Sequence, residues 1–166
     1  MPVTDDSQRL KFAQWILERH LAWIAAAEVK TGVVVAIDTV MVGALATAFS
    51  AQQSIERAAW IDLVAFVAGA CLASALFCAA MALLPRVDGP KSSKIFFGRI
   101  AQNDALDYSQ RFQTTLVAEH LVDCLAQIHR NAEIARDKYQ WVRKSILWSF
   151  LAILPWTIAL ALLIRK

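Results

Sequence analysis

The sequence lacks the motifs of an enzyme active site. It contains no GxSxG, no HExxH, no phosphate-binding P-loop and no GxGxxG. Its three histidines, His20, His120 and His129, are not paired at the i, i+4 spacing that metal sites on helices use. We expect these histidines on solvated or interfacial faces, and we expect no catalytic residues and no enzyme activity.

Cysteine is also scarce. Cys71 and Cys78 are seven residues apart, so on one helix they lie ~10 Å from each other along the axis, too far for a disulfide. Together with Cys124 they are too few, and wrongly spaced, for a zinc site. We expect the three cysteines to serve as small side chains at helix contacts, and we expect no bound metal.

The charge balance excludes a further class of partner. A net charge of +3 does not suggest binding to duplex nucleic acid.

Residues 1–30 include four acids and lack a small-residue cleavage site. We therefore expect no cleaved signal peptide, and the first apolar run should act as an uncleaved anchor.

What the sequence does contain is three long apolar runs, at 31–49, 61–84 and 146–164. Each is close to the ~20 residues that a helix needs to cross a ~30 Å hydrocarbon layer. Because 58% of all residues are hydrophobic, an ordinary soluble domain is excluded. We predict an all-α integral membrane protein in which residues 1–166 form a single domain with three transmembrane helices.

Basic residues are distributed unevenly around these runs. The link between the first two runs contains only Arg57. Basic residues are instead frequent soon after the second run, at Arg86, Lys91, Lys94 and Arg99, and shortly before the third, at Arg136, Lys138, Arg143 and Lys144. By the positive-inside rule, the N-terminus and segment 85–145 are expected to face the cytoplasm.

An amphipathic segment precedes the first run. Apolar residues in 4–30 recur at spacings of three and four, with Thr4 or Asp5 as the N-cap. Only Gly32, a weak breaker, separates this cytoplasmic helix from the first run, so the two should form one helix of nearly fifty residues.

Segment 85–103, with its prolines, glycine and serines, is expected to be a cytoplasmic loop. Residues 104–145 carry an apolar stripe and are expected to be cytoplasmic helices that continue into the third run. A single helix over 104–144 would be ~60 Å long. The chain that leaves the second run would have to cover that whole distance in ~18 residues, which is the full reach of an extended chain. We therefore predict a break near 113–115, with Thr114 or Thr115 capping the second helix. The two extensions should lie side by side and parallel.

Small residues four apart predict close helix contacts in the first two runs. The pairs are Gly43 and Thr47, Ala44 and Ala48, Gly69 and Ala73, and Ala75 and Ala79. The third run is bulkier and contains Pro155. We predict a tight hairpin of the first two runs and a more lipid-facing third run, kinked near Pro155.

Asp38 lies well inside the first run. An acid there costs ~2.5–3.5 kcal/mol on insertion scales and is by default a hypothesis of function. The other two runs contain no basic residue to pair with it. Two interpretations stay open. In the structural one, Asp38 forms an interhelical hydrogen bond or its side chain reaches toward the cytoplasmic surface. In the functional one, several copies of the chain form a homo-oligomer with a ring of Asp38 carboxylates that favours cations.

Polar residues gather where the helices are expected to enter the bilayer: Glu28, Lys30, Lys138, Tyr139, Arg143 and Lys144. Basic residues at this level meet anionic lipid head groups. They can instead hold a phosphate while Phe96, Phe97 or Tyr139 stacks on a base. Both interpretations stay open at this point.

The order of several short motifs resembles that of the Pycsar membrane effectors, small bacterial proteins that accompany a cyclase making cyclic pyrimidine mononucleotides in defence against phage. The motifs are Glu28-Val29-Lys30, Ile95-Phe96-Phe97-Gly98, and 128–139 with Asn131, Ile134 and Lys138-Tyr139. The resemblance runs from about residue 12 to 164, and Asp is common in the family where this chain has Glu28.

The resemblance implies an anti-phage effector of the bacterial inner membrane. Cyclic CMP or cyclic UMP from a cognate cyclase would activate it to impair membrane integrity, which causes abortive infection. The candidate ligand-binding residues are Glu28, Lys30, Phe96, Phe97, Asn131, Lys138, Tyr139 and Arg143, with Asp38 as the intramembrane polar residue. Besides the nucleotide we expect no cofactor, and we expect membrane lipid and further copies of the chain as partners.

An alternative function stays open. The chain could be a structural or scaffolding membrane protein, or a channel-like subunit, whose helical stalk binds a partner and which has no nucleotide ligand.

Overall fold

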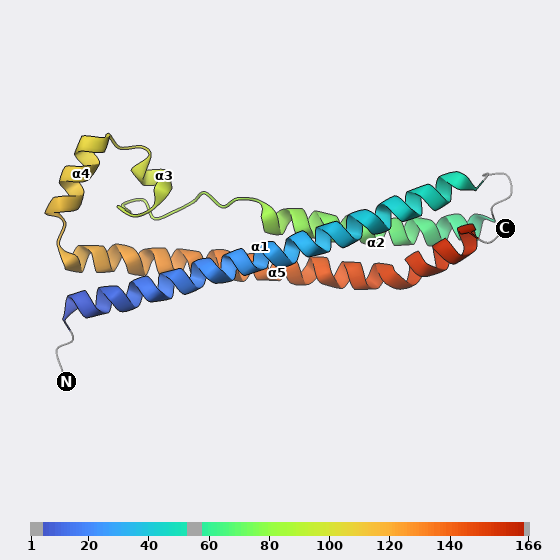
Figure 1. The fold of residues 1–166 in the computed structure, drawn as a ribbon, viewed down its shortest axis with the longest axis horizontal. Helices are drawn as coiled ribbons and strands as arrows, with labels where there is room; N and C mark the ends of the chain where they lie inside the picture. Colours follow the sequence, from blue (N-terminus) through green and yellow to red (C-terminus); the bar gives the residue numbers. More distant parts are fainter. Residues whose placement is uncertain (1–4, 53–57, 165–166) are drawn as a thin grey trace. The chain divides into compact units, whose positions relative to one another are not determined.

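Every element formed by the described residues, 5–52 and 58–164, is a helix in this computed structural model. In chain order they are α1 (Asp6–Ala51), α2 (Ala59–Leu83), α3 (Phe97–Ile100), α4 (Ala105–Thr114) and α5 (Val117–Ile164) (Figure 1). α1, α2 and α5 are each long and apolar enough to cross a membrane. The predicted all-α fold with three membrane spans is therefore confirmed.

The chain divides into two compact units. The polar unit consists of the chain up to Ala26 together with Pro85–Asp137, and the apolar unit consists of Ala27–Leu84 and the chain from Lys138 onward. α1, with 46 residues, and α5, with 48, each contribute to both units. The prediction that the first and third membrane runs continue long helical extensions is confirmed.

Asp5 caps α1. Its carboxylate accepts hydrogen bonds from the Ser7 amide at 3.4 Å and from the Ser7 hydroxyl at 2.6 Å, and its carbonyl oxygen accepts hydrogen bonds from the amides of Gln8 and Arg9. This geometry satisfies amides that the first turn of a helix leaves without partners. Asp5 is thus the N-cap. Thr4, the alternative, and Arg57 in the predicted external link lie outside the described residues.

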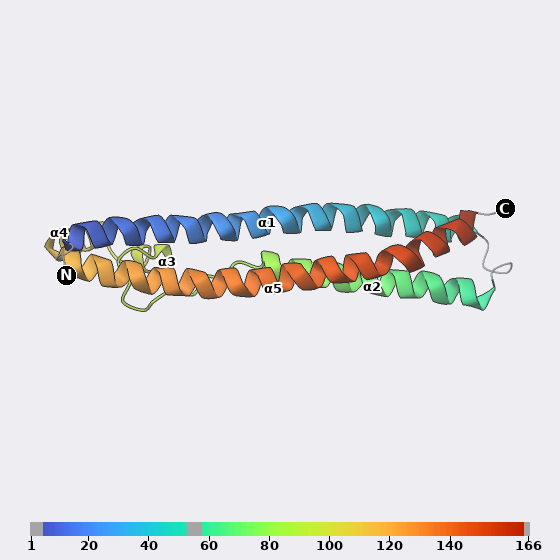
Figure 2. The same cartoon turned by 90° about the horizontal axis from the view of Figure 1, so that it is seen from below.

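Within the polar unit, α1 and α5 lie side by side and run in the same direction, as both views show (Figures 1 and 2). The Nδ1 atom of His20 lies 3.2 Å from the carbonyl oxygen of Ile128. The predicted parallel pair of extensions is confirmed.

The break before α5 is where the length argument placed it, but its capping differs. Thr114 is the last residue of α4 and Thr115 is the C-cap of that helix. The carbonyl of Leu116 accepts hydrogen bonds from two amides in the first turn of α5, those of Glu119 and His120. Both threonines instead bond backward to carbonyls of α4, so the predicted cap was wrong. Within the expected 85–103 loop, residues 97–100 form the short helix α3.

Small side chains of α2 form the centre of the apolar unit. One buried cluster joins Leu45 of α1, Ala65 and Ala68 of α2, and Ala159 and Leu163 of α5. Because α5 supplies two residues to this cluster and α1 one, the expectation that the third run is the more lipid-facing one was wrong. The first two runs do pack against each other, through Leu45, Ala65 and Ala68. Figure 2 shows α5 bending in its last third, the part that contains Pro155, in agreement with the predicted kink.

The predicted small-residue pairs are only partly buried. Ala75 and Ala79 are fully buried, but Thr47 and Ala73 are exposed. A Cβ at Gly43 or Gly69 would meet nothing within 4 Å. A membrane helix is apolar on every side, so spacing alone does not identify which face packs against protein.

Gly89 permits a close contact with an aromatic ring in the polar unit. A Cβ at this position would lie 2.5 Å from ring atoms of Phe96, closer than carbon atoms approach. We expect Gly89→Ala to destabilise the protein by about 1–3 kcal/mol through overpacking, seen as a lower melting temperature in detergent. Gly32→Ala, where a Cβ meets nothing within 4 Å, should not lower it. Equal melting temperatures for the two variants would contradict this assignment.

Candidate functional site

The sequence-predicted ligand residues fall into two groups, one in each unit. Glu28, Lys30, Lys138, Tyr139 and Arg143 belong to the apolar unit, whereas Phe96, Phe97 and Asn131 belong to the polar unit. Within the first group the structure brings Lys138 to Glu28 and Lys30 to Tyr139. The three members of the second group line one cavity.

Lys138 joins three helices of the apolar unit. Its ammonium donates to Glu28 Oε1 on α1 and to the carbonyl oxygen of Ala82 on α2, both at 2.9 Å. Ala82 is one of the last residues of α2, where carbonyls have no partner within the helix. Lys138 is only 3% exposed, so this buried side chain links α1, α2 and α5. We call its contacts with Glu28 and Ala82 the Lys138 clasp. Arg143, in contrast, is exposed.

Lys30 and Tyr139 form a second contact near this clasp. The Lys30 ammonium lies 5.5 Å from the centroid of the Tyr139 ring, within the range of a cation–π interaction. The Tyr139 ring is therefore occupied by a protein cation in this structure.

The cavity around Phe96, which we call the aromatic cavity, has a volume of about 300 Å³. Its lining includes Phe96, Phe97 and Asn131, which the sequence selected, and also Arg86 and Arg130. Asn131 donates its side-chain amide to the Gln127 carbonyl at 2.9 Å. Arg130 was not selected from the sequence because its role depends on a partner in the distant 85–90 segment.

Both arginines of the aromatic cavity are already paired with carboxylates. Arg86 contacts Asp137 at 2.7 Å, and Arg130 contacts Glu133 at 2.9 Å and Asp88 at 3.7 Å. The hydrogen bond from Arg130 lowers the pKa of Glu133. Burial alone would raise the pKa of Asp137, but hydrogen bonds from Arg136 and Arg86 outweigh it and the pKa is lowered. These pairs lose their stabilising effect only as the pH falls through the lowered values.

A second cavity of the polar unit, which we call the basic pocket, has a volume of about 340 Å³. Its lining combines basic, amide, hydroxyl and aromatic side chains and contains no carboxylate: Lys91, Ser92, Ser93, Lys94, Arg99, Gln102, Asn103, Tyr108, Arg111 and Phe112. Sequence reasoning had treated the basic residues of this segment only as orientation signals. The occurrence of serines and aromatic residues among these basic residues was the sequence pattern that could have indicated a binding site.

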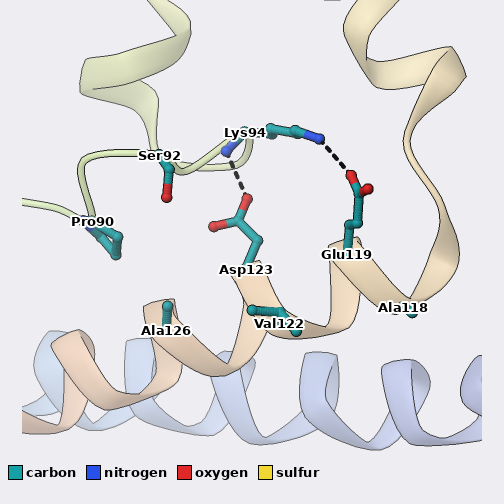
Figure 3. A pocket seen from close by; sticks show the side chains of 8 residues that line it. All are labelled: Pro90, Ser92, Lys94, Ala118, Glu119, Val122, Asp123 and Ala126. Carbon is teal, nitrogen blue, oxygen red and sulfur yellow. Dashed lines mark hydrogen bonds and ion pairs between the residues drawn. The ribbon is translucent and has the colours of Figure 1, made fainter.

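Lys94 fastens this region to neighbouring helices. Its backbone amide donates to Asp123 at 2.6 Å, and its ammonium donates to Glu119 at 3.0 Å and to the Thr115 hydroxyl at 2.7 Å. Its carbonyl accepts the Tyr108 hydroxyl at 3.0 Å. Figure 3 shows the first two of these contacts at the edge of an adjoining cavity of about 420 Å³. The wall of the basic pocket is therefore tied to the start of α5.

Asp38 belongs to α1 in the apolar unit, is 0% exposed and lies at the contact with α5. Its Oδ2 accepts the Ser149 hydroxyl at 2.8 Å. Its Oδ1 has no hydrogen-bond partner among the described residues. Of the two interpretations of Asp38, the structure contains the interhelical hydrogen bond.

Comparison with known proteins gives a consistent result. The family model described as the Pycsar effector protein domain matches residues 12–165. The Pycsar effector protein PtPycTM of Propioniciclava tarda is 31% identical over 141 residues, which cover 79% of this chain and 68% of that protein. No solved structure matches the chain.

Proposed function

The chain belongs to the Pycsar effector protein family, and we propose that a cyclic pyrimidine mononucleotide activates it to impair the bacterial inner membrane. The nucleotide is cyclic CMP or cyclic UMP, made by a cognate cyclase during phage infection. The observation that carries this proposal is the family match over residues 12–165, which includes both units. Three helices able to cross a membrane provide the means of acting on it, without a catalytic step.

Ligand binding and membrane action are assigned to different units. The polar unit contains the cavities with charged and amide side chains, and the apolar unit contains the apolar helix segments. Because α1 and α5 supply residues to both, a ligand that favours one arrangement of the polar unit also biases these helices. Activation would then repack the contacts around Ala75, Ala79 and Ser145, opening a leak.

The Asp38 carboxylate makes this leak selective for cations. When α1 and α5 separate at Ser149, the carboxylate becomes accessible and favours cations along the path. Under a KCl gradient in a planar bilayer, the wild-type reversal potential should shift toward that of K⁺, and the shift should be lost in Asp38→Asn. An unchanged potential in the variant would remove Asp38 from the conducting path.

Expression in bacteria tests the proposed function directly. The protein is produced with an active pyrimidine nucleotide cyclase or with the same cyclase inactivated at its catalytic site. We expect growth arrest and entry of a membrane-impermeant dye only with the active enzyme. The scaffolding alternative predicts the same growth and the same dye exclusion in both strains.

A further inference from the structure

We infer that the basic pocket binds the phosphate and the base of the activating nucleotide, an assignment that rests on the proposed function. The ligand class is a pyrimidine nucleoside with a cyclic phosphodiester, which carries one negative charge. The pocket lies between the 91–94 segment, the region of α3, and α4.

Charge distinguishes this pocket from the aromatic cavity. Arg111 is paired with Asp107 at 2.9 Å, and Lys94 is paired with Glu119 at 3.0 Å. Lys91 and Arg99 have no carboxylate partner among the described residues; Arg99 donates only to the neutral amide oxygen of Gln102, at 2.9 Å. Two positive charges are therefore available to a phosphodiester, since no carboxylate has to be displaced first.

The rest of the lining suits a pyrimidine. Tyr108 and Phe112 lie with ring centroids 6.1 Å apart, and the Tyr108 hydroxyl is held by the Lys94 carbonyl. Such rings offer a face on which a base stacks. The Gln102 amide oxygen accepts from Arg99 at 2.9 Å, and the Asn103 amide nitrogen donates to the Arg99 carbonyl at 2.7 Å. These contacts leave the Gln102 amide nitrogen as a donor and the Asn103 amide oxygen as an acceptor, a pair that matches the mixed edge of cytosine or uracil. A volume of about 340 Å³ lies within the range of ~300–1,000 Å³ typical of small-molecule sites.

Occupation of this pocket would act on α5. Lys94, in the pocket wall, is bonded to Glu119 and Asp123 of α5. A ligand that draws Lys94 toward its phosphate weakens the contact with Glu119. The start of α5 is then the first element to respond.

Binding measurements on the full-length protein in detergent test the assignment. Isothermal titration calorimetry is carried out with 3′,5′-cyclic CMP and 3′,5′-cyclic UMP. We expect Arg99→Gln and Lys91→Gln each to raise the Kd of the preferred nucleotide at least about tenfold, because each removes a charged donor. The matched control is Arg136→Gln, an exposed arginine of the polar unit outside the pocket, which should leave the Kd unchanged. The melting temperature of each variant reports whether it is folded.

The outcomes separate this inference from the proposed function. Unchanged affinity in folded Arg99→Gln and Lys91→Gln would overturn the pocket assignment and leave the proposed function intact. Loss of binding in Phe97→Ala or Asn131→Ala, with Arg99→Gln unaffected, would likewise overturn it and place the ligand in the aromatic cavity. Equal displacement by inorganic phosphate would overturn the recognition of a base. Failure of the wild-type protein to bind either nucleotide would overturn the proposed function itself.

Discussion

Replacing Lys138 by methionine should lower the free energy of unfolding by about 2–4 kcal/mol. Methionine fills a similar volume but cannot donate, so the Ala82 carbonyl and the Glu28 carboxylate both lose their hydrogen bond. The carbonyl lies in a site that Lys138 itself covers, since Lys138 is only 3% exposed. Glu28 is 49% exposed, so water partly replaces its lost partner and the effect stays below that of a fully buried pair.

Thermal unfolding in detergent measures this effect, with two variants for comparison. Glu28→Gln should cost less, about 1 kcal/mol or below, because its amide oxygen still accepts from Lys138 and Lys138 keeps the Ala82 carbonyl. Lys144→Met, at an exposed position beside Trp141, should have little effect. A Lys138→Met protein as stable as Lys144→Met would show that the clasp does not hold the three helices.

Replacing Ala68 by leucine should be similarly disruptive, lowering stability by about 1–3 kcal/mol or more through overpacking. Ala68 is 0% exposed and packs in the cluster with Leu45 of α1 and Ala159 of α5. The extra atoms have no space and would push α2 away from both helices. Close approach through small side chains is what holds helices together in lipid.

Ala73→Leu is the matched control on the same helix. Ala73 is exposed, so its leucine faces the surroundings and should leave the melting temperature within a degree or two, on the scale of surface substitutions. Sequence spacing had predicted Ala73 at a helix contact, so the pair of variants decides between the two faces of α2. Greater damage from Ala73→Leu than from Ala68→Leu would contradict the observed packing.

The features predicted correctly from the sequence depend on local pattern or on chain length. Apolar runs near the length of a bilayer predicted three spanning helices, and unbroken periodicity predicted the extensions in α1 and α5. The break between Thr114 and Val117 followed from the reach of the 85–103 segment. None of these needs knowledge of which side chains meet.

The features that were missed depend on tertiary contacts. The inward face of α2 was not predictable because residues such as Ala68 and Ala73 are equally apolar. The basic pocket was missed because Lys91 and Arg99 were interpreted only as cytoplasmic flank charges. Only the folding of α3 and α4 beside the 91–94 segment brings them together with Phe112.

The structure places the predicted ligand residues in separate groups. Phe96, Phe97 and Asn131 do line one cavity, because the 95–98 segment folds against α5. Their contact with a nucleotide stays a prediction. Lys138 and Glu28 were selected as ligand residues, but the structure commits them to each other across the helices.

Leakage from proteoliposomes tests the central claim most directly. The full-length protein is reconstituted into liposomes loaded with a self-quenching dye, and 3′,5′-cyclic CMP, 3′,5′-cyclic UMP or 3′,5′-cyclic AMP is added on both sides. The account predicts that one of the two pyrimidine nucleotides releases the dye, that cyclic AMP does not, and that Arg99→Gln requires a higher nucleotide concentration for the same release. Dye release that is the same with and without every nucleotide would contradict it.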